Sequence, residues 1–229
     1  MEFSRYDARN YPMVDVKTGY GEWADRYENA MLDEMDVRLL ERLAIDWSAL
    51  ATVADLACGT GRIGAWLAAR GAGDIDGVDL TPAMLAQARN KGCYRRVVEA
   101  DVRDTGLDAG SYDLVIQSLA CEHLPELAPL YAEAARLARP SGTLVIAGYH
   151  PCFMLRGIPT HFDRRSGEPL AIDTHLHLLS DHVRAAGSAG WYLADMHERV
   201  VDGVFTAHKP SWDRHLGWPI SYATAWQRE

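Results

Sequence analysis

The amino-acid sequence predicts a single-domain α/β protein with a doubly wound, mostly parallel sheet. Short apolar segments alternate with amphipathic helix patterns along most of the 229 residues. A glycine-rich turn joins one apolar segment directly to a helix pattern, and acidic residues follow three successive apolar segments. Strands that alternate with helices form parallel βαβ units, and ligands bind where such strands end. No linker-like stretch divides the chain, so we expect one domain.

Seven segments have the length and apolar character of strands. The last two are separated by a turn and a loop instead of a long helix, which indicates an antiparallel hairpin at one edge of the sheet. The expected strands are residues 52–57, 75–80, 96–99, 114–118, 143–147, 191–201 and 220–226.

Helix patterns fill most of the intervals between these strands. Thr81 and Pro82 form a start signal, with threonine as the cap and proline at the first helical position. Residues 149–179, by contrast, are long, rich in His and Pro, and expected to be irregular. The expected helices are residues 23–42, a segment after residue 61, a segment after residue 81, residues 125–138, and residues 180 to 187–190.

The glycine-rich turn is open to two interpretations. Gly59, Gly61 and Gly64 satisfy the dinucleotide fingerprint, and Asp79 lies about 20 residues downstream, where a ribose-binding acid is expected. Asp55, however, ends the preceding strand, and its carboxylate would repel a pyrophosphate. Acids at three strand ends suit a ligand that has an ammonium group, a ribose diol and an adenine amine. S-adenosylmethionine has all three groups.

Five segments in order over residues 53–148 resemble the motifs of class I S-adenosylmethionine-dependent methyltransferases. The resemblance implies a Rossmann-like methyltransferase fold, with S-adenosyl-L-methionine as cofactor and S-adenosyl-L-homocysteine as product. It also divides the domain into an N-terminal helical cap over residues 1–45, a cofactor core over 46–148, and an acceptor-side lid with the terminal hairpin over 149–229. The matching segments are residues 53–61, 77–85, 99–103, 112–120 and 137–146.

The resemblance also implies a role for each residue of the cofactor site. Asp79 is expected to hold both ribose hydroxyls, and Asp101 to accept from the adenine amine. Asp55 is expected to orient the loop amides and the methionine ammonium, and Ser118 to line the sulfonium. The expected cofactor residues are Tyr20, Tyr27, Asp55, Ala57, Cys58, Gly59, Gly61, Asp79, Leu80, Met84, Asp101, Val102 and Ser118.

Histidines are the candidates for a base that would deprotonate the acceptor, because neutral imidazole accepts protons near pH 7. All nine lie at position 123 or later, in the half that would build the acceptor side. His123 follows the fourth strand, His150 follows the fifth, and His161 lies in a lid-like segment. His175 and His177 raise the question of a metal site, but no ligand pattern completes one, so no metal is expected.

The lid region is apolar, which suits a small apolar or aromatic acceptor. Oxygen is the favoured acceptor atom, then carbon, then nitrogen, in the biosynthesis of a secondary metabolite or quinone-like compound. Two alternatives are a non-methylating enzyme on this fold, such as a cyclase, and a binding or regulatory protein that retains the cofactor loop. The apolar lid residues are Phe153, Met154, Leu155, Ile158, Phe162, Trp191 and Trp212.

Charge and composition argue against several partners. The net charge of −9 disfavours nucleic acid, and residues 117–120 lack the Asn/Asp-Pro-Pro-Tyr/Phe signature of methyltransferases that act on exocyclic amines. No apolar run approaches the ~18 residues of a membrane span, and the N-terminus lacks a signal-peptide core. A cytoplasmic protein that acts on a small molecule is expected, and a homodimer is compatible with the sequence.

Overall fold

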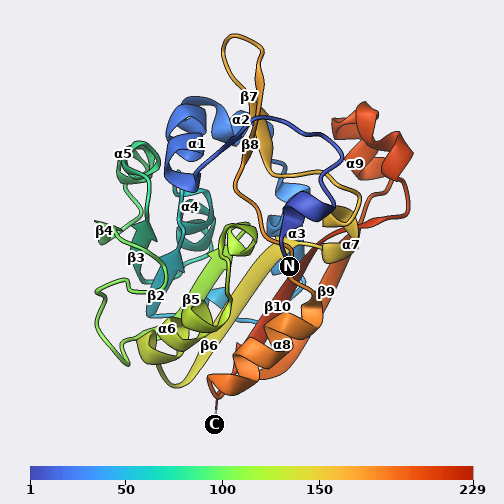
Figure 1. Ribbon diagram of the computed structural model, residues 1–229. Coiled ribbons are helices and arrows are strands. Elements are labelled where there is room, and N and C mark those ends of the chain that lie inside the picture. Colours follow the sequence, from blue (N-terminus) through green and yellow to red (C-terminus); the bar gives the residue numbers. More distant parts are fainter. Residues whose placement is uncertain (229) are drawn as a thin grey trace.

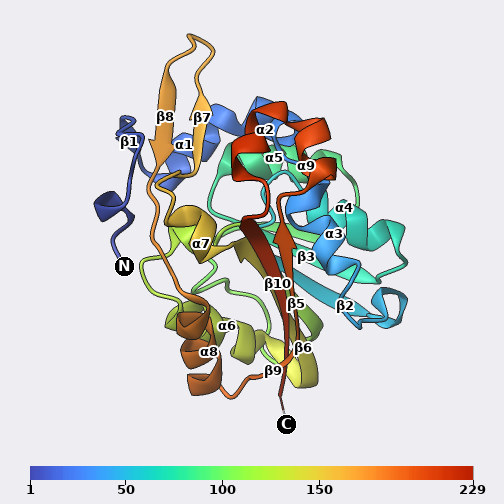
Figure 2. The same cartoon turned by 90° about the vertical axis from the view of Figure 1, so that its right-hand side faces the viewer.

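A seven-stranded sheet forms the centre of the computed structural model, which describes residues 1–228 (Figures 1 and 2). The strand order is β4-β3-β2-β5-β6-β10-β9, and β10 runs antiparallel to both of its neighbours. Strands β2 to β6 are parallel to one another, as the sequence predicts. The bounds are β2 Thr52–Leu56, β3 Asp74–Asp79, β4 Arg96–Glu99, β5 Tyr112–Ser118, β6 Ala138–Tyr149, β9 Tyr192–Val200 and β10 Pro219–Gln227.

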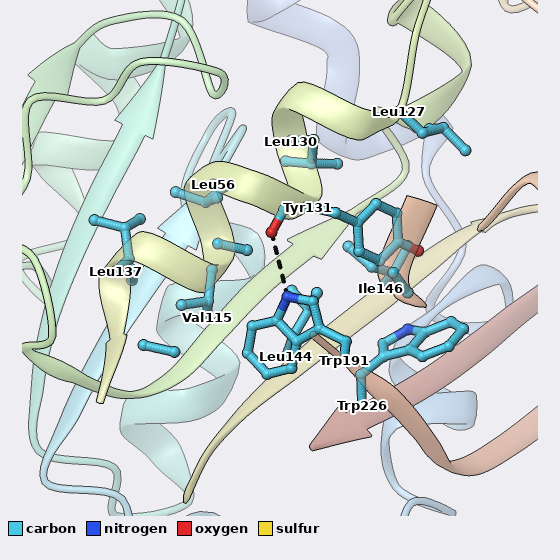
Figure 3. Packing of buried hydrophobic residues seen from close by; sticks show 14 of the residues in the cluster. Leu56, Val115, Leu127, Leu130, Tyr131, Leu137, Leu144, Ile146, Trp191 and Trp226 are labelled. Atoms are coloured by element: carbon cyan, nitrogen blue, oxygen red, sulfur yellow. Dashed lines mark hydrogen bonds between the residues drawn. The ribbon is translucent and has the colours of Figure 1, made fainter. Parts of the chain in front are cut away.

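Helices cover both faces of this sheet, because successive strand side chains point to opposite faces. On β5, Val115 packs beneath α6 (Ala128–Leu137) and α8 (Leu179–Ser188), as Figure 3 shows in part. Its neighbours Leu114 and Ile116 point to the other face, toward α3 (Val37–Leu40) and α4 (Arg62–Ala69). On the first face the Trp191 indole N–H donates to the carbonyl of Tyr131 at 3.2 Å, so this aromatic side chain is buried without losing its polar partner.

Short elements make up the rest of the chain. The remaining helices are α1 Val16–Trp23, α2 Tyr27–Ala30, α5 Pro82–Asn90, α7 Pro151–Met154 and α9 Gly203–His208, with 3₁₀ turns η1 Phe3–Arg5, η2 Ala24–Arg26, η3 Asp33–Met35, η4 Trp47–Ala49, η5 Cys121–His123 and η6 Pro210–His215. None of the helices in residues 1–228 combines the length and apolar character that crossing a membrane requires.

The prediction of one helix over residues 23–42 is wrong. The backbone is extended at Met31 and Leu32, which separates α2 from η3 and α3. This break brings Asp36 to the side chain of Arg62 in α4, where the two form an ion pair. Asp36 also caps α3 by accepting from the Val37 N–H at 2.7 Å. The ion pair between Asp36 and Arg62 therefore interrupts a segment whose own sequence pattern favours a continuous helix.

The prediction that residues 149–179 are irregular is also wrong. They contain α7 and a hairpin of β7 (His161–Asp163) and β8 (Pro169–Ile172), which projects at the top of Figure 1. Strand β1 (Met13–Val14) pairs with β8 in parallel, which completes a three-stranded sheet. Such short strands offer too few residues for an alternating pattern to be visible in the sequence.

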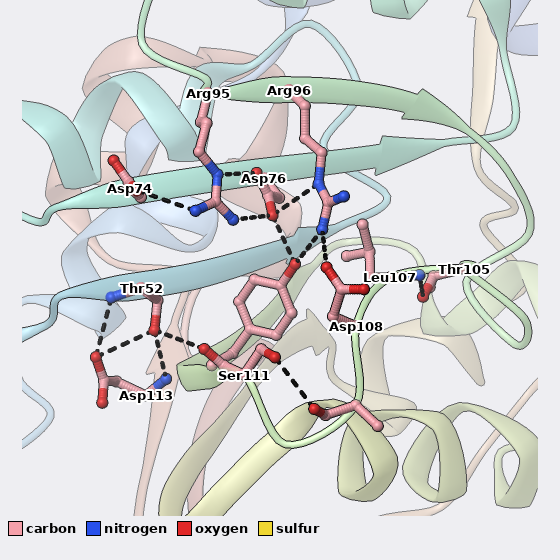
Figure 4. A network of polar contacts seen from close by, with 12 residues as sticks. Thr52, Asp74, Asp76, Arg95, Arg96, Thr105, Leu107, Asp108, Ser111 and Asp113 are labelled. Carbon is pink, nitrogen blue, oxygen red and sulfur yellow. Dashed lines mark hydrogen bonds and ion pairs between the residues drawn. The ribbon is translucent and has the colours of Figure 1, made fainter.

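A polar network connects β3 with the starts of β4 and β5 (Figure 4). Asp76 of β3 is fully buried, and its carboxylate accepts from Arg95 at 2.6 Å, from Arg96 at 3.0 Å and from the Tyr112 hydroxyl at 2.6 Å. Burial opposes ionisation, but these hydrogen bonds lower the pKa of Asp76 below its usual value. The network therefore holds β3, β4 and β5 in register at the end opposite the site described next.

Candidate functional site

One cavity, named the main cavity because most of the predicted cofactor residues line it, opens where β2, β3 and β5 end and where the chain leaves β4. It has a volume of about 200 Å³. Helix α1 contributes to its wall from the N-terminal part of the chain. The lining residues are Val16, Tyr20, Tyr27, Ala57, Gly59, Asp79, Leu80, Thr81, Met84, Asp101, Val102, Arg103, Ser118, Leu119, Ala120, His123 and Leu124.

Asp79 links two segments of this cavity. One carboxylate oxygen accepts from the Gly59 N–H at 2.9 Å, and the other accepts from the Thr81 N–H at 2.8 Å. Burial raises the pKa of Asp79, and these backbone hydrogen bonds oppose the rise. A carboxylate oxygen accepts about two hydrogen bonds, so each oxygen keeps capacity for a donor from a ligand.

Two non-glycine residues at the edge of the cavity have left-handed backbone conformations. Ala57 follows β2 with φ 55°, and Leu119 follows β5 with φ 54°. This conformation costs of order 1–2 kcal/mol for an ordinary L-residue, and such residues gather at ligand sites. The backbone therefore turns sharply at the ends of two adjacent strands, next to the space where a ligand would lie.

Gly61 and Gly64 pack against Tyr94 rather than lining the cavity. A Cβ on Gly61, whose φ is +85°, would lie 2.9 Å from the Tyr94 ring, and one on Gly64 would lie 2.2 Å from its hydroxyl oxygen. The Tyr94 hydroxyl donates to Asp55 at 2.7 Å. Asp55 is buried, and burial raises its pKa to about 7. The glycines thus make room for the side chain that holds this carboxyl group.

A second, smaller cavity of about 30 Å³ adjoins the first. Asp55, Cys58 and Thr60 line it, and Tyr27, Ala57, Gly59 and Ser118 line both cavities. The Ser118 hydroxyl donates to Asp36 at 2.6 Å, and Asp36 pairs with Arg62. Ser118 is therefore held toward the N-terminal segment.

His123 and Tyr20 form a hydrogen-bonded pair in the wall of the main cavity. The Tyr20 hydroxyl lies 2.8 Å from Nε2 of His123, and Nδ1 lies 2.7 Å from the carbonyl oxygen of Asp173. A carbonyl only accepts, so Nδ1 carries the ring proton of the neutral histidine and Nε2 accepts from Tyr20. Tyr20 is thereby oriented with oxygen lone pairs left for the cavity.

A third cavity of about 130 Å³ lies between the N-terminal segment and the region after β6. Its wall is mainly apolar, and Lys209 is the single lysine or arginine among the described residues that line it. The lining residues are Trp23, Ala30, Met31, Leu32, Met35, Tyr149, Phe153, Met154, Ile158, Pro159, Thr160, His161, Lys209 and Trp212. Trp23 and Tyr27 pack edge to face with ring centroids 5.1 Å apart, so this acceptor-side cavity neighbours the main one.

The sequence and fold are similar to those of known methyltransferases. A family profile described as "Methyltransferase domain" matches residues 54–146. Trans-aconitate 2-methyltransferase of Escherichia coli O1:K1 / APEC is 29% identical over 200 residues, which cover 79% of this chain and 75% of that protein. Malonyl-[acyl-carrier protein] O-methyltransferase of Salmonella typhimurium is 29% identical over 130 residues, which cover 56% of this chain and 51% of that protein.

A solved S-adenosylmethionine-dependent methyltransferase from Mesorhizobium loti superposes with a TM-score of 0.67 at 23% identity, covering 85% of this chain and 98% of that one. Residues 54–146 thus match a methyltransferase domain, and the chain has the fold of S-adenosylmethionine-dependent methyltransferases. S-adenosylmethionine is the cofactor on which the solved methyltransferases of this fold depend, and the cavity at the strand ends is where its predicted ligands gather.

The methyltransferase brings most of the predicted cofactor residues together. Asp55 and Cys58 lie in the adjoining small cavity, and Gly61 lines neither, because it packs against Tyr94. Asp101 is engaged by Arg103, whose guanidinium donates to both carboxylate oxygens at 2.8 and 2.6 Å. The predicted residues that line the main cavity are Tyr20, Tyr27, Ala57, Gly59, Asp79, Leu80, Met84, Asp101, Val102 and Ser118.

Of the three candidate histidines, only His123 lines the main cavity. The expectation that His150 acts as the base disagrees with its position. Its Nε2 lies 2.7 Å from Glu198 of β9, and its Nδ1 accepts from the Cys152 N–H at 3.1 Å, so it joins the sheet edge to α7. His161 lines the acceptor-side cavity instead, with Nδ1 2.8 Å from the Pro159 carbonyl. Within residues 1–228, no cluster of His, Cys, Asp or Glu is placed to hold a metal ion.

Several residues of the methyltransferase site were not predicted. Leu119 and Ala120 directly follow Ser118, so their position after a strand could have identified them. Tyr94 gave no such signal, because it acts through Asp55, which lies far from it in the sequence. Arg103, by contrast, lies two residues after Asp101, so its proximity to that acid could have identified it. Glu122 directly precedes His123, so its position after a strand could have identified it, whereas its burial is visible only in the structure.

Proposed function

We propose that this enzyme transfers the methyl group of S-adenosylmethionine to an oxygen atom of a small apolar or aromatic acceptor. Carbon and nitrogen are the next candidates for the acceptor atom, and the biosynthesis of a secondary metabolite or quinone-like compound is the proposed context. One observation carries the proposal: a cavity lined by strand-end acids lies beside a mainly apolar one, with Trp23 and Tyr27 in contact between them.

The main cavity fits the cofactor's groups. Asp79 retains acceptor capacity on both oxygens, which suits a vicinal diol. Leu80 and Met84 offer an apolar surface for the adenine, and the Val102 N–H is proposed to bind a ring nitrogen. Asp101 is proposed to accept from the adenine amine while it stays paired with Arg103. Asp55 is proposed to attract the methionine ammonium from the small cavity.

The acceptor-side cavity suggests the chemistry of the acceptor. Phe153, Met31 and Trp212 provide an apolar wall, whereas Thr160 and Tyr149 offer isolated hydroxyl groups. The curated relatives are named for trans-aconitate and malonyl-[acyl-carrier protein] as acceptors, and both of these are acids. An acceptor that carries an anionic substituent would fit the lysine at this cavity.

Bound S-adenosylmethionine supplies an electrophilic methyl group on its sulfonium. The protein must then align the acceptor and, where the acceptor is a hydroxyl, remove its proton. Alignment contributes most of the rate enhancement of such a displacement. His123 is proposed as the base, because it lines the cavity and its Nε2 is free of a ring proton in the neutral form.

Incubation with methyl-labelled S-adenosylmethionine and a panel of phenols, carboxylates, indoles and amines tests the function. Mass spectrometry of the products would identify both the acceptor class and the methylated atom. Label transfer to a phenol or carboxylate oxygen supports the proposal. Tight cofactor binding without transfer to any acceptor, together with rearrangement of a polyene substrate, would support a non-methylating enzyme instead.

A further inference from the structure

We propose that Glu122 is a positioning residue in a proton relay that runs from Tyr20 through His123. The inference rests on the proposed function and extends it. Glu122 lies on η5, directly after β5, and is 3% exposed. Within residues 1–228 neither of its carboxyl oxygens has a hydrogen-bond partner. Because buried polar groups nearly always have partners, an orphaned carboxyl group beside the site requires an explanation.

The geometry places Glu122 next to the base. Its Oε1 lies 3.8 Å from Nε2 of His123, the same nitrogen that accepts from the Tyr20 hydroxyl at 2.8 Å. The Asp173 carbonyl holds the ring proton on Nδ1. A second proton on this ring therefore has to arrive at Nε2, close to the Glu122 carboxylate.

These contacts define a balanced transfer. The acceptor O–H proton passes to Oη of Tyr20 as the proton of Tyr20 passes to Nε2 of His123. The acceptor oxygen forms its bond to the methyl carbon, and the electrons of the breaking carbon–sulfur bond remain on sulfur. The imidazolium that results is stabilised by the Glu122 carboxylate, because opposite charges interact strongly where water is excluded.

The other groups near Glu122 do not supply the positive charge that the Glu122 carboxylate is proposed to stabilise. Burial raises the pKa of Glu122, and the neighbouring His123 opposes part of this rise. Burial lowers the pKa of His177, and lowers that of His182 to about 3, so both are neutral near pH 7. The titratable groups that face Glu122 are Tyr20 of α1, Tyr27 of α2, Cys121 and His123 of η5, Tyr149 of β6, Tyr222 of β10, His175 and His177 before α8, and His182 of α8.

The first test needs no acceptor. Protein with ¹⁵N-labelled histidine is saturated with S-adenosylhomocysteine, and the ring nitrogens of His123 are followed by NMR between pH 5 and 8. In the wild type the neutral ring should carry its proton on Nδ1. In Glu122→Gln the doubly protonated fraction of His123 at a given pH should fall several-fold, because the counter-charge is lost. Glu198→Gln, which alters a similar pair at His150, should leave His123 unchanged.

The second test uses the phenols or carboxylic acids that the wild type methylates. For a phenol, Tyr20→Phe should lower kcat at least tenfold, and Glu122→Gln should lower kcat and move the acidic limb of its pH profile to lower pH with little change in KM. A carboxylate acceptor has no proton to remove, so both variants should lower kcat much less with a carboxylate than with a phenol. Identical His123 titration in the wild type and Glu122→Gln would overturn the inference even if methyl transfer is found. If the His123 titration differs between the wild type and Glu122→Gln as expected but no acceptor is methylated, only the proposed function is overturned.

Discussion

The Asp79 carboxylate accepts a hydrogen bond from the Gly59 backbone N–H at 2.9 Å. One side chain at the end of β3 therefore fixes the loop that follows β2, and it is also the side chain proposed to hold the ribose. Loop geometry and cofactor affinity thus depend on the same group, and substitutions can separate the two contributions.

We expect Asp79→Ala to reduce affinity for S-adenosylmethionine by about 1–3 kcal/mol, since hydrogen-bonding groups of the ligand and the loop lose their partners. Asp79→Asn keeps the shape and one acceptor oxygen, and should lose less. Isothermal titration calorimetry measures both. Equal affinity of the wild type and Asp79→Ala would exclude the ribose role.

Gly59 and Gly61 should respond differently to alanine. A Cβ at Gly61 meets the Tyr94 ring and the Ala88 backbone, whereas a Cβ at Gly59 meets no protein atom within 4 Å. We expect Gly61→Ala to reduce the free energy of unfolding by roughly 2–3 kcal/mol through strain and crowding. Gly59→Ala should cost roughly 1 kcal/mol of stability. It should lower cofactor affinity more than Gly61→Ala does, because its new methyl group points into open space where the ligand would lie. Urea denaturation combined with calorimetry distinguishes them, and the opposite ranking would contradict the assignment of Gly61 to packing.

Asp55 should make the stability depend on pH. Burial raises its pKa to about 7, whereas an unfolded aspartate titrates near 3.9. Between these values the folded state keeps a proton that the unfolded state has released, so stability falls as pH rises and levels off above pH 7. Asp55→Asn should therefore gain about 3 kcal/mol relative to the wild type between pH 5 and pH 8. Denaturation curves at the two pH values provide the measurement, and a constant difference would show that Asp55 does not titrate in this range.

His123 and His150 should have separable roles. His123→Ala should lower kcat by about 10²-fold or more, the usual contribution of a general base. His150→Ala removes the cap of α7 and the link to Glu198, so we expect it to cost about 1–2 kcal/mol of stability with kcat close to the wild-type value. Thermal unfolding and steady-state kinetics decide the assignment, and a large loss of kcat in His150→Ala alone would restore that residue as the base.

Most of the central sheet was predictable because the segments that form β2, β3 and β5 are largely buried and because β3 and β4 end in acidic residues. The parallel arrangement of β2 to β6 and the antiparallel pairing of β9 with β10 were expected. The path of residues 23–42 was not, because it depends on the distant pair of Asp36 and Arg62. The orientation of His150 was not predictable either, since it depends on Glu198 of β9, two strands away across the sheet.

Because β1 pairs with β8, Met13 and Val14 belong to the same small sheet as the hairpin of β7 and β8. Ion pairs from Arg164 to Glu22 and from Arg165 to Asp25 join the same two regions on the surface. Helix α1 carries Tyr20 and begins two residues after β1. Because β1 is paired with the hairpin, the hairpin also fixes the position of α1. Release of S-adenosylhomocysteine and entry of new S-adenosylmethionine should then require β1, α1 and the hairpin of β7 and β8 to move together. This exchange should become faster as salt is added, because salt screens the two ion pairs.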